Sequence, residues 1–280
     1  MRGLINVEVF EVESSGQVTP TPSDPDQSPG DLNTYTWTGA EYSNITNQAI
    51  YSLSFWRNQA AARGISLGFI IGVWEPYNSL VNQRYEPITH NVLDDFRWIN
   101  QIMEQCRPPF SGCRAEGYGV SAPPALIFSR DNVATRVEEY NHDQLNRVSP
   151  PYDGAFSVFV AYNPPGAPSF FPGSGGIYAY TYDLSGPWVQ TLFINDYWGS
   201  NNFDRVLSHE TGHVFWACDE YNAGCFRTGC NSCTRGRGPR PTAPNRNCEV
   251  GQCIGPQACI MNGAVDWTGL CGDTPLQIGW

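Results

Sequence analysis

The sequence contains no lysine: all 16 of its basic residues are arginines, set against 27 acidic residues in a chain of 280. The net charge of −11 repels phosphate backbones, so nucleic acids and anionic membrane surfaces are poor partners, although a local basic patch remains from Arg235 to Arg246. No apolar run approaches the roughly 18 residues that a transmembrane helix needs. With 41% hydrophobic and 13% aromatic residues the chain is not disordered, and we expect a globular monomer.

Cysteine, by contrast, is plentiful. Two of the ten cysteines lie at Cys106 and Cys113, and the other eight lie between Cys218 and Cys271. An even number at short spacing is typical of disulfide-bonded proteins of oxidising compartments, although the pairing cannot be deduced. Four of the eight could instead hold a structural zinc ion, namely Cys225, Cys230, Cys233 and Cys248. We favour disulfides, because four of them would use all eight cysteines.

The start of the chain bears on location. Residues 1–3 lead straight into an apolar alternation and leave no room for a signal peptide. Together with the cysteines, this favours the mature form of a secreted, extracellular protein.

Hydrophobic periodicity predicts strands and helices in alternation. The predicted strands are 5–12, 65–74, 125–128, 156–162, 176–182 and 189–195, with 65–74 fully buried. The predicted helices are a first one capped by Thr38 and Glu41 and ending near Gly64, a second over 91–105, and a third over 203–217 capped by Asn202. This order indicates an α+β fold: a mixed twisted sheet with backing helices over 1–217, then a small Cys-rich subdomain over 218–280.

An acidic, proline-rich loop is predicted over 14–31. Its Asp24, Asp26 and Asp31 could bind calcium, but without EF-hand spacing we expect a solvated loop.

The predicted third helix carries the chemistry. It contains His209-Glu210-x-x-His213, and residues at i and i+4 share one helix face, so both imidazoles can reach one zinc ion. Glu210 then lies beside the reacting water as a general base.

A catalytic zinc needs a third protein ligand, and no histidine follows His213. The candidates are Asp219, Glu220, Glu249, Asp266, Asp273, a cysteine, and the distant His90 and His142. We favour Asp219, because a chain reversal just past the helix could return its carboxylate to the metal. Glu220 remains the alternative, and otherwise points away as a group that orients a histidine or a loop.

These residues resemble the metzincin zinc peptidases, whose third ligand follows ten residues after the first histidine. Asp219 stands at that position, as in some secreted bacterial members, and Asp219-Glu220-Tyr221 is similar to a run in several bacterial secreted metallopeptidases. The resemblance also implies a Met-turn beneath the zinc, and residues 259–263 with Met261 look like that turn.

The resemblance further implies an edge strand that binds extended substrate, here Gly176, Ile177, Tyr178, Ala179 and Tyr180. Two departures stand out. Trp216 replaces the glycine of the turn after the helix, so the helix must end by another route. No tyrosine follows Met261 by two residues, so a tyrosine ligand from the Met-turn is absent. Tyr221 could stabilise the transition state instead, but we favour an aromatic packing role for it.

The resulting hypothesis is a zinc metalloendopeptidase that hydrolyses peptide bonds of protein substrates with a metal-activated water. The alternative is a catalytically silent zincin-fold module that binds glycan or protein through its aromatic residues. The intact Glu210 favours the enzyme.

Overall fold

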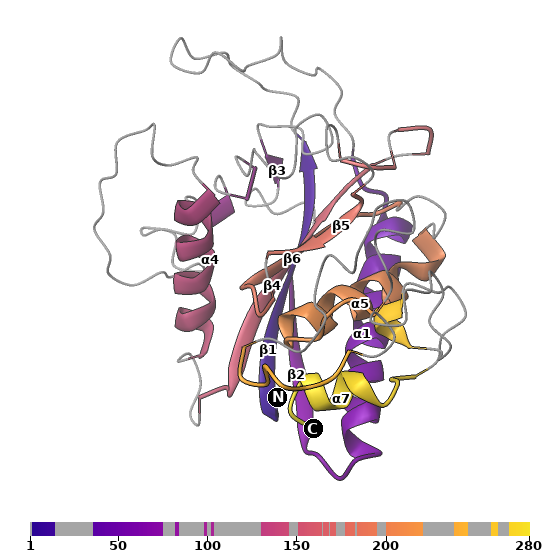
Figure 1. The fold of residues 1–280 in the computed structure, drawn as a ribbon. Coiled ribbons are helices and arrows are strands. Elements are labelled where there is room, and N and C mark those ends of the chain that lie inside the picture. Colours follow the sequence, from indigo (N-terminus) through magenta and orange to yellow (C-terminus); the bar gives the residue numbers. More distant parts are fainter. Residues whose placement is uncertain are drawn as a thin grey trace, which may run out of the picture.

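The computed structural model describes residues 2–14, 36–74, 82–83, 98–99, 102–103, 130–145, 151–163, 165–167, 169–171, 177–182, 184–194, 200–220, 238–245, 259–262 and 269–280. In these ranges a sheet stands between helices on both of its faces (Figure 1). None of these helices is long and apolar enough to span a bilayer. The fold is α+β, as predicted.

The sheet has five strands in the order β2-β1-β4-β6-β5. Their bounds are β1 Gly3–Ser14, β2 Leu67–Trp74, β4 Gly154–Ala161, β5 Ala179–Thr181 and β6 Trp188–Leu192. The first four in this order are parallel, and β5 alone runs antiparallel to its neighbour β6. A two-residue strand, β3 (Asn82–Gln83), pairs with the end of β1. The terminal strand β5 is therefore the one described strand of reversed direction.

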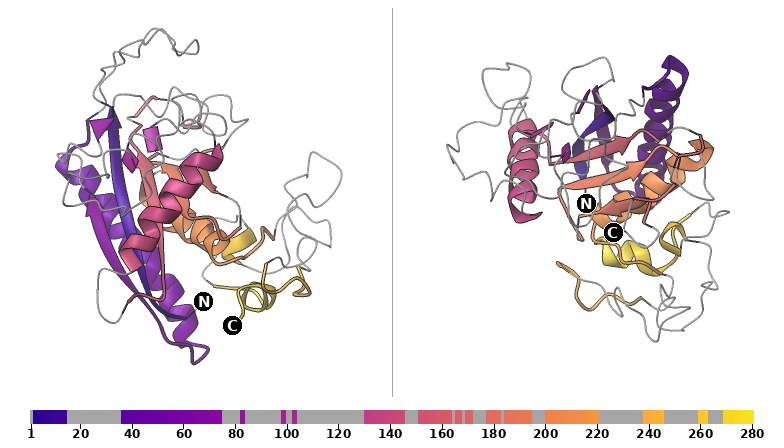
Figure 2. Two further views of the ribbon diagram at one scale, coloured as in Figure 1. Left: turned by 90° about the vertical axis from the view of Figure 1, so that its left-hand side faces the viewer. Right: turned by 90° about the horizontal axis from the view of Figure 1, so that it is seen from above.

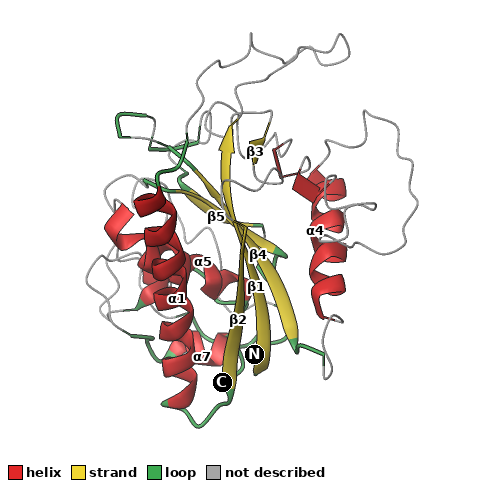
Figure 3. Cartoon of the chain, turned by 180° about the vertical axis from the view of Figure 1, so that it is seen from behind, coloured by secondary structure: helices red, strands yellow, loops and turns green. Residues whose placement is uncertain are grey.

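Helix α1 (Gly39–Ala61) covers one face of the sheet, as Figure 3 shows from behind. Thr38 and Glu41 form the predicted capping box, and Gly64 follows the helix with a φ of 71°. The predicted apolar stripe is at most 2% exposed; its members are Ile45, Ala49, Leu53, Trp56 and Ala60. Through this stripe α1 packs on β2 and on α5 (Phe203–Val214), the helix that carries His209 and His213.

Helix α4 (Arg130–Leu145) covers the opposite face and is missing from the predicted elements. Its buried side mixes Val137 and Tyr140 with Asn141 and Gln144, so the apolar stripe is weak. Asn141 is buried and bridges two neighbouring strands: its Nδ2 donates to the carbonyl of Pro187, just before β6, at 2.7 Å, and its Oδ1 accepts from the hydroxyl of Ser157 in β4 at 2.8 Å. Tertiary hydrogen bonds thus replace the hydrophobic signal that sequence periodicity needs.

Other predicted elements differ in detail. Strand β2 lies at the sheet edge and is only partly buried, with Ile70 44% exposed, so the expectation of a fully buried strand is wrong. The predicted strand 176–182 contributes only residues 179–181 to the sheet. Residues 98–99 and 102–103 of the predicted second helix are helical and buried. Residues 125–128 and the acidic residues of loop 14–31 lie outside the described ranges.

The last described segments return to the core beside α1. These are η3 (Ile260–Asn262), a single 3₁₀ turn, and α7 (Asp273–Gln277). Cys259, Ile260, Met261 and Ile278 are buried in the same hydrophobic cluster as the α1 stripe. The two ends of the chain lie close to each other in both views of Figure 2.

Candidate metal centre

Helix α5 (Phe203–Val214) carries the motif and is held by α1 rather than by its own cap. Asn202 makes no side-chain capping hydrogen bond, so that prediction is wrong. Gln48 of α1 caps the start of the helix instead, because its Oε1 accepts a hydrogen bond from the Asp204 N–H at 3.0 Å. Further along, the Trp56 indole N–H donates to the Ser208 carbonyl at 3.0 Å. The helix therefore has a defined position on α1 before any ligand binds.

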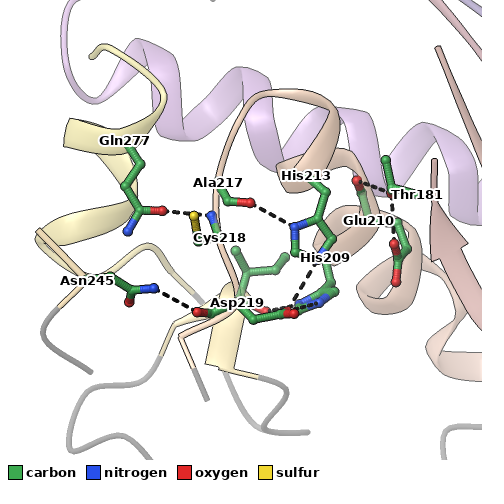
Figure 4. A network of polar contacts seen from close by, with 10 residues as sticks. Thr181, His209, Glu210, His213, Ala217, Cys218, Asp219, Asn245 and Gln277 are labelled. Carbon is green, nitrogen blue, oxygen red and sulfur yellow. Dashed lines mark hydrogen bonds and ion pairs between the residues drawn. The ribbon is translucent and has the colours of Figure 1, made fainter. Parts of the chain in front are cut away.

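His209 and His213 lie one turn apart on α5, with ring centroids 4.9 Å apart and planes at 89° (Figure 4). Each Nδ1 lies 2.8 Å from a backbone carbonyl oxygen, that of Ile260 for His209 and that of Ala217 for His213. A carbonyl only accepts, so each Nδ1 carries the proton. In the neutral rings both Nε2 atoms therefore present lone pairs, which is the arrangement of metal-binding histidines.

Asp219 closes the site. Its Oδ1 lies 3.1 Å from Nε2 of His209 and 3.3 Å from Nε2 of His213. Ligands of a tetrahedral zinc, at bonds of about 2.0 to 2.1 Å, lie about 3.3 Å from one another, so the carboxylate oxygen is spaced from each imidazole nitrogen as zinc ligands are. The imidazole side chains are 14% exposed and the carboxylate 18%, which leaves a side open to solvent.

The charges at this site also call for a cation. Asp219 Oδ1 is buried, and among the described residues its polar neighbours are the two imidazole Nε2 atoms, which can donate to it only when they carry a proton. Without a metal ion, a proton on the His213 imidazole supplies the positive charge beside the carboxylate. Burial lowers the pKa of His213, but the charge of Asp219 and its hydrogen bond outweigh burial and raise that pKa to about 9. Burial likewise raises the pKa of Asp219, and the two imidazoles more than reverse this, so its pKa is strongly lowered.

The return of the chain from His213 to Asp219 depends on Trp216. Its φ is 75°, in the left-handed region that glycine usually occupies after a helix. The helix thus ends by the expected reversal in spite of the tryptophan, and the prediction of another route is wrong. The indole packs on Gly238, where an added Cβ would lie 2.3 Å from the ring. This packing offsets the roughly 1–2 kcal/mol that a non-glycine residue costs in this conformation.

Met261 packs against α5, the helix that carries the two histidines. Its side chain is fully buried, and a Cβ added to Gly212 would lie 2.4 Å from its sulfur. The Glu220 N–H donates to the Met261 carbonyl at 2.8 Å, which joins the two segments. Gly212 directly precedes His213 on the helix, and its lack of a side chain leaves room for the methionine. The spacing of the motif alone did not reveal this role.

Glu210 is 8% exposed and faces strand β5. The Thr181 hydroxyl lies 2.8 Å from both its carbonyl oxygen and its Oε2, and donates its single hydrogen to one of them. Thr181 is the main site residue that the sequence analysis missed. Its only signal was its position next to Tyr180 in the predicted edge strand.

Of the remaining candidates, those that the structure describes lie away from the site. Glu220 is fully buried and belongs to a separate group with Cys259 and Cys271. Asp273 is buried in α7, and His142 is an exposed residue of α4 on the far face of the sheet. Several candidates lie outside the described residues: His90, Gly176, Tyr221, Glu249, Asp266 and the cysteines Cys225, Cys230, Cys233 and Cys248.

The chain matches no known family model and no curated protein sequence. The arrangement of His209, His213 and Asp219 around one point is therefore a geometric finding: these three residues could hold a metal ion.

Proposed function

We propose that this protein is a zinc-dependent endopeptidase of the metzincin type. The observation that carries the proposal is the convergence of three lone-pair atoms, two imidazole Nε2 and one carboxylate oxygen, at the spacing of zinc ligands. The intact glutamate between the two histidines favours catalysis over a purely structural metal.

Zinc at this site would supply a Lewis acid that polarises the peptide carbonyl and acidifies a neighbouring water. The other steps belong to the chain. Glu210 accepts the proton of the attacking water and passes it to the leaving amine. Ile260 and Ala217 keep the two imidazoles in the metal-binding tautomer through their carbonyls.

Strand β5 supports a peptide substrate. It ends the strand order of the sheet, and its Thr181 contacts Glu210 directly. An extended peptide that adds to such an edge places its backbone carbonyls along the strand, next to the general base. Ile177, Tyr178, Ala179 and Tyr180 would then contact substrate, as the metzincin resemblance implies.

The direct test replaces Glu210 with Gln. The expected result is a folded protein that binds one zinc ion per chain yet has lost peptide hydrolysis by several orders of magnitude. Glu138→Gln, an exposed position on α4, is the matched control and should retain full activity. Hydrolysis of casein by wild type that survives complete zinc removal, or by the Glu210→Gln variant, would contradict the proposal. A wild type that binds zinc but cleaves no protein or peptide would favour the binding module instead.

A further inference from the structure

A second polar group lies buried under the metal centre and takes no part in the proposed reaction. Glu220, Cys259 and Thr274 are fully buried, and Cys271 is 6% exposed. The Thr274 hydroxyl donates to Glu220 Oε1 at 2.6 Å. The Cys271 sulfur lies 2.9 and 2.8 Å from the two Glu220 oxygens, and the Cys259 sulfur lies 3.1 Å from the Thr274 oxygen.

The two cysteines of this group are close together and their backbones are joined. Both are free thiols, with sulfurs less than 4.8 Å apart. The Cys271 N–H donates to the Cys259 sulfur at 3.2 Å, and the Ile260 N–H donates to the Gly269 carbonyl at 3.1 Å. The Cys271 Cα is only one bond of about 1.5 Å beyond that nitrogen. Rotation about the Cα–Cβ bonds is therefore enough to bring the sulfurs together.

A metal ion fits this group less well than a disulfide. A closed structural zinc site takes four protein ligands, and the described residues supply three, with a threonine hydroxyl already engaged by Glu220. Oxidation, in contrast, costs Glu220 only a weak thiol donor and leaves the Thr274 hydroxyl in place. The eight cysteines between Cys218 and Cys271 are a density typical of chains that fold where cysteines are oxidised.

We propose that Cys259 and Cys271 are a redox pair that closes into a disulfide beneath the metal centre. The oxidant is a small-molecule disulfide such as oxidised glutathione. A thiolate of the pair attacks it, which breaks its S–S bond and releases one glutathione thiol. The second cysteine then attacks the mixed disulfide, forms the Cys259–Cys271 bond and releases the other glutathione thiol. The pair loses two electrons and two protons, and the oxidant gains them.

The position of the pair gives the bond a consequence at the metal centre. Cys259 lies two residues before Met261 and directly before Ile260. The Ile260 carbonyl oxygen is the group that orients His209. Cys271 directly precedes the segment that enters α7. A disulfide would tie these two segments together and hold the Ile260 carbonyl in place. The effect on His209 matters only if the proposed zinc site is correct, whereas formation of the disulfide does not depend on that site.

The first experiment is peptide mapping of the full-length wild type after incubation with oxidised glutathione. No basic residue follows Arg246, so trypsin leaves both cysteines in one peptide, and cleavage before Asp266 is needed to separate them. The expected product is a linked pair of peptides, two hydrogens lighter than the sum, that separates on reduction. Alkylation of both cysteines in the unfolded, unreduced protein would overturn the proposal, and so would pairing of either with another cysteine.

The second experiment compares oxidised wild type with a Cys259→Ala/Cys271→Ala double variant. Loss of a disulfide that closes such a short loop should lower Tm by roughly 5 to 10 °C. Zinc release to a chelator should become roughly tenfold faster, because the carbonyl that orients His209 is freed. Wild type under reductant is the matched control and should behave like the variant. Two zinc ions per chain in wild type and one in the variant would overturn the proposal in favour of a metal site. Because the mapping needs no activity, it separates this proposal from the fate of the proposed peptidase.

Discussion

Replacing Thr181 with Val tests how the general base is held. The two side chains have nearly the same shape, and residue 181 is 5% exposed at the end of β5, where it pairs with Val189. The substitution therefore removes one hydroxyl and little else. Glu210 Oε2 then loses a donor at 2.8 Å and its carboxylate is no longer oriented by the edge strand.

The size of the effect follows from that contact. A hydrogen bond to a charged group contributes about 1.5 to 3 kcal/mol. If the bond orients the base in the transition state, its loss should reduce kcat roughly 10- to 100-fold. Glu210 keeps a small exposed fraction, so water can replace part of the lost bond, and we expect the lower half of this range.

The assay is steady-state hydrolysis of a quenched fluorescent peptide, with zinc content and Tm measured in parallel. Thr181→Val should lower kcat with KM and zinc stoichiometry almost unchanged. Thr181→Ser, which restores the hydroxyl, should recover most of the activity. An unchanged kcat in Thr181→Val would show that the hydroxyl donates to the Glu210 carbonyl oxygen instead, and that the base needs no such support.

Three further predictions concern the metal centre. Asp219→Ala should lose most of its zinc, while Glu220→Ala should keep it at reduced stability; metal analysis with the reverse outcome would exchange the two roles. Gly212→Ala should destabilise the protein by about 1 to 3 kcal/mol in chemical denaturation, because the new methyl group meets the Met261 sulfur, although alanine at an ordinary helix site would stabilise. In zinc-free protein the pKa of His213 is raised to about 9, so protonated His213 contributes stability that is fully present below about pH 6.5 and lost as pH rises through about 9. A Tm of the zinc-free protein that rises over that interval would contradict this contribution.

Local chemistry was predictable from the sequence. The spacing of His209 and His213 placed both on one helix face, because the helical repeat alone determines which side chains share a face. The capping box at Thr38 and the α1 stripe were equally local and were found as predicted. Helix α4 was not predicted, because its buried Asn141 is satisfied by hydrogen bonds to Ser157 and Pro187 that only the tertiary fold brings to it.

The sequence by itself determined which residues could bind a metal and left several candidates for the third ligand. The tertiary structure brought one of them, Asp219, within 3.3 Å of both imidazoles. That placement requires Trp216 in a left-handed conformation, held by packing on Gly238, and the contact of Met261 with Gly212. Such contacts join segments that are far apart in the chain, and no periodicity or motif encodes them. The tautomers of the histidines and the support of Glu210 by Thr181 were decided in the same way, by carbonyls and hydroxyls that only folding brings to the site.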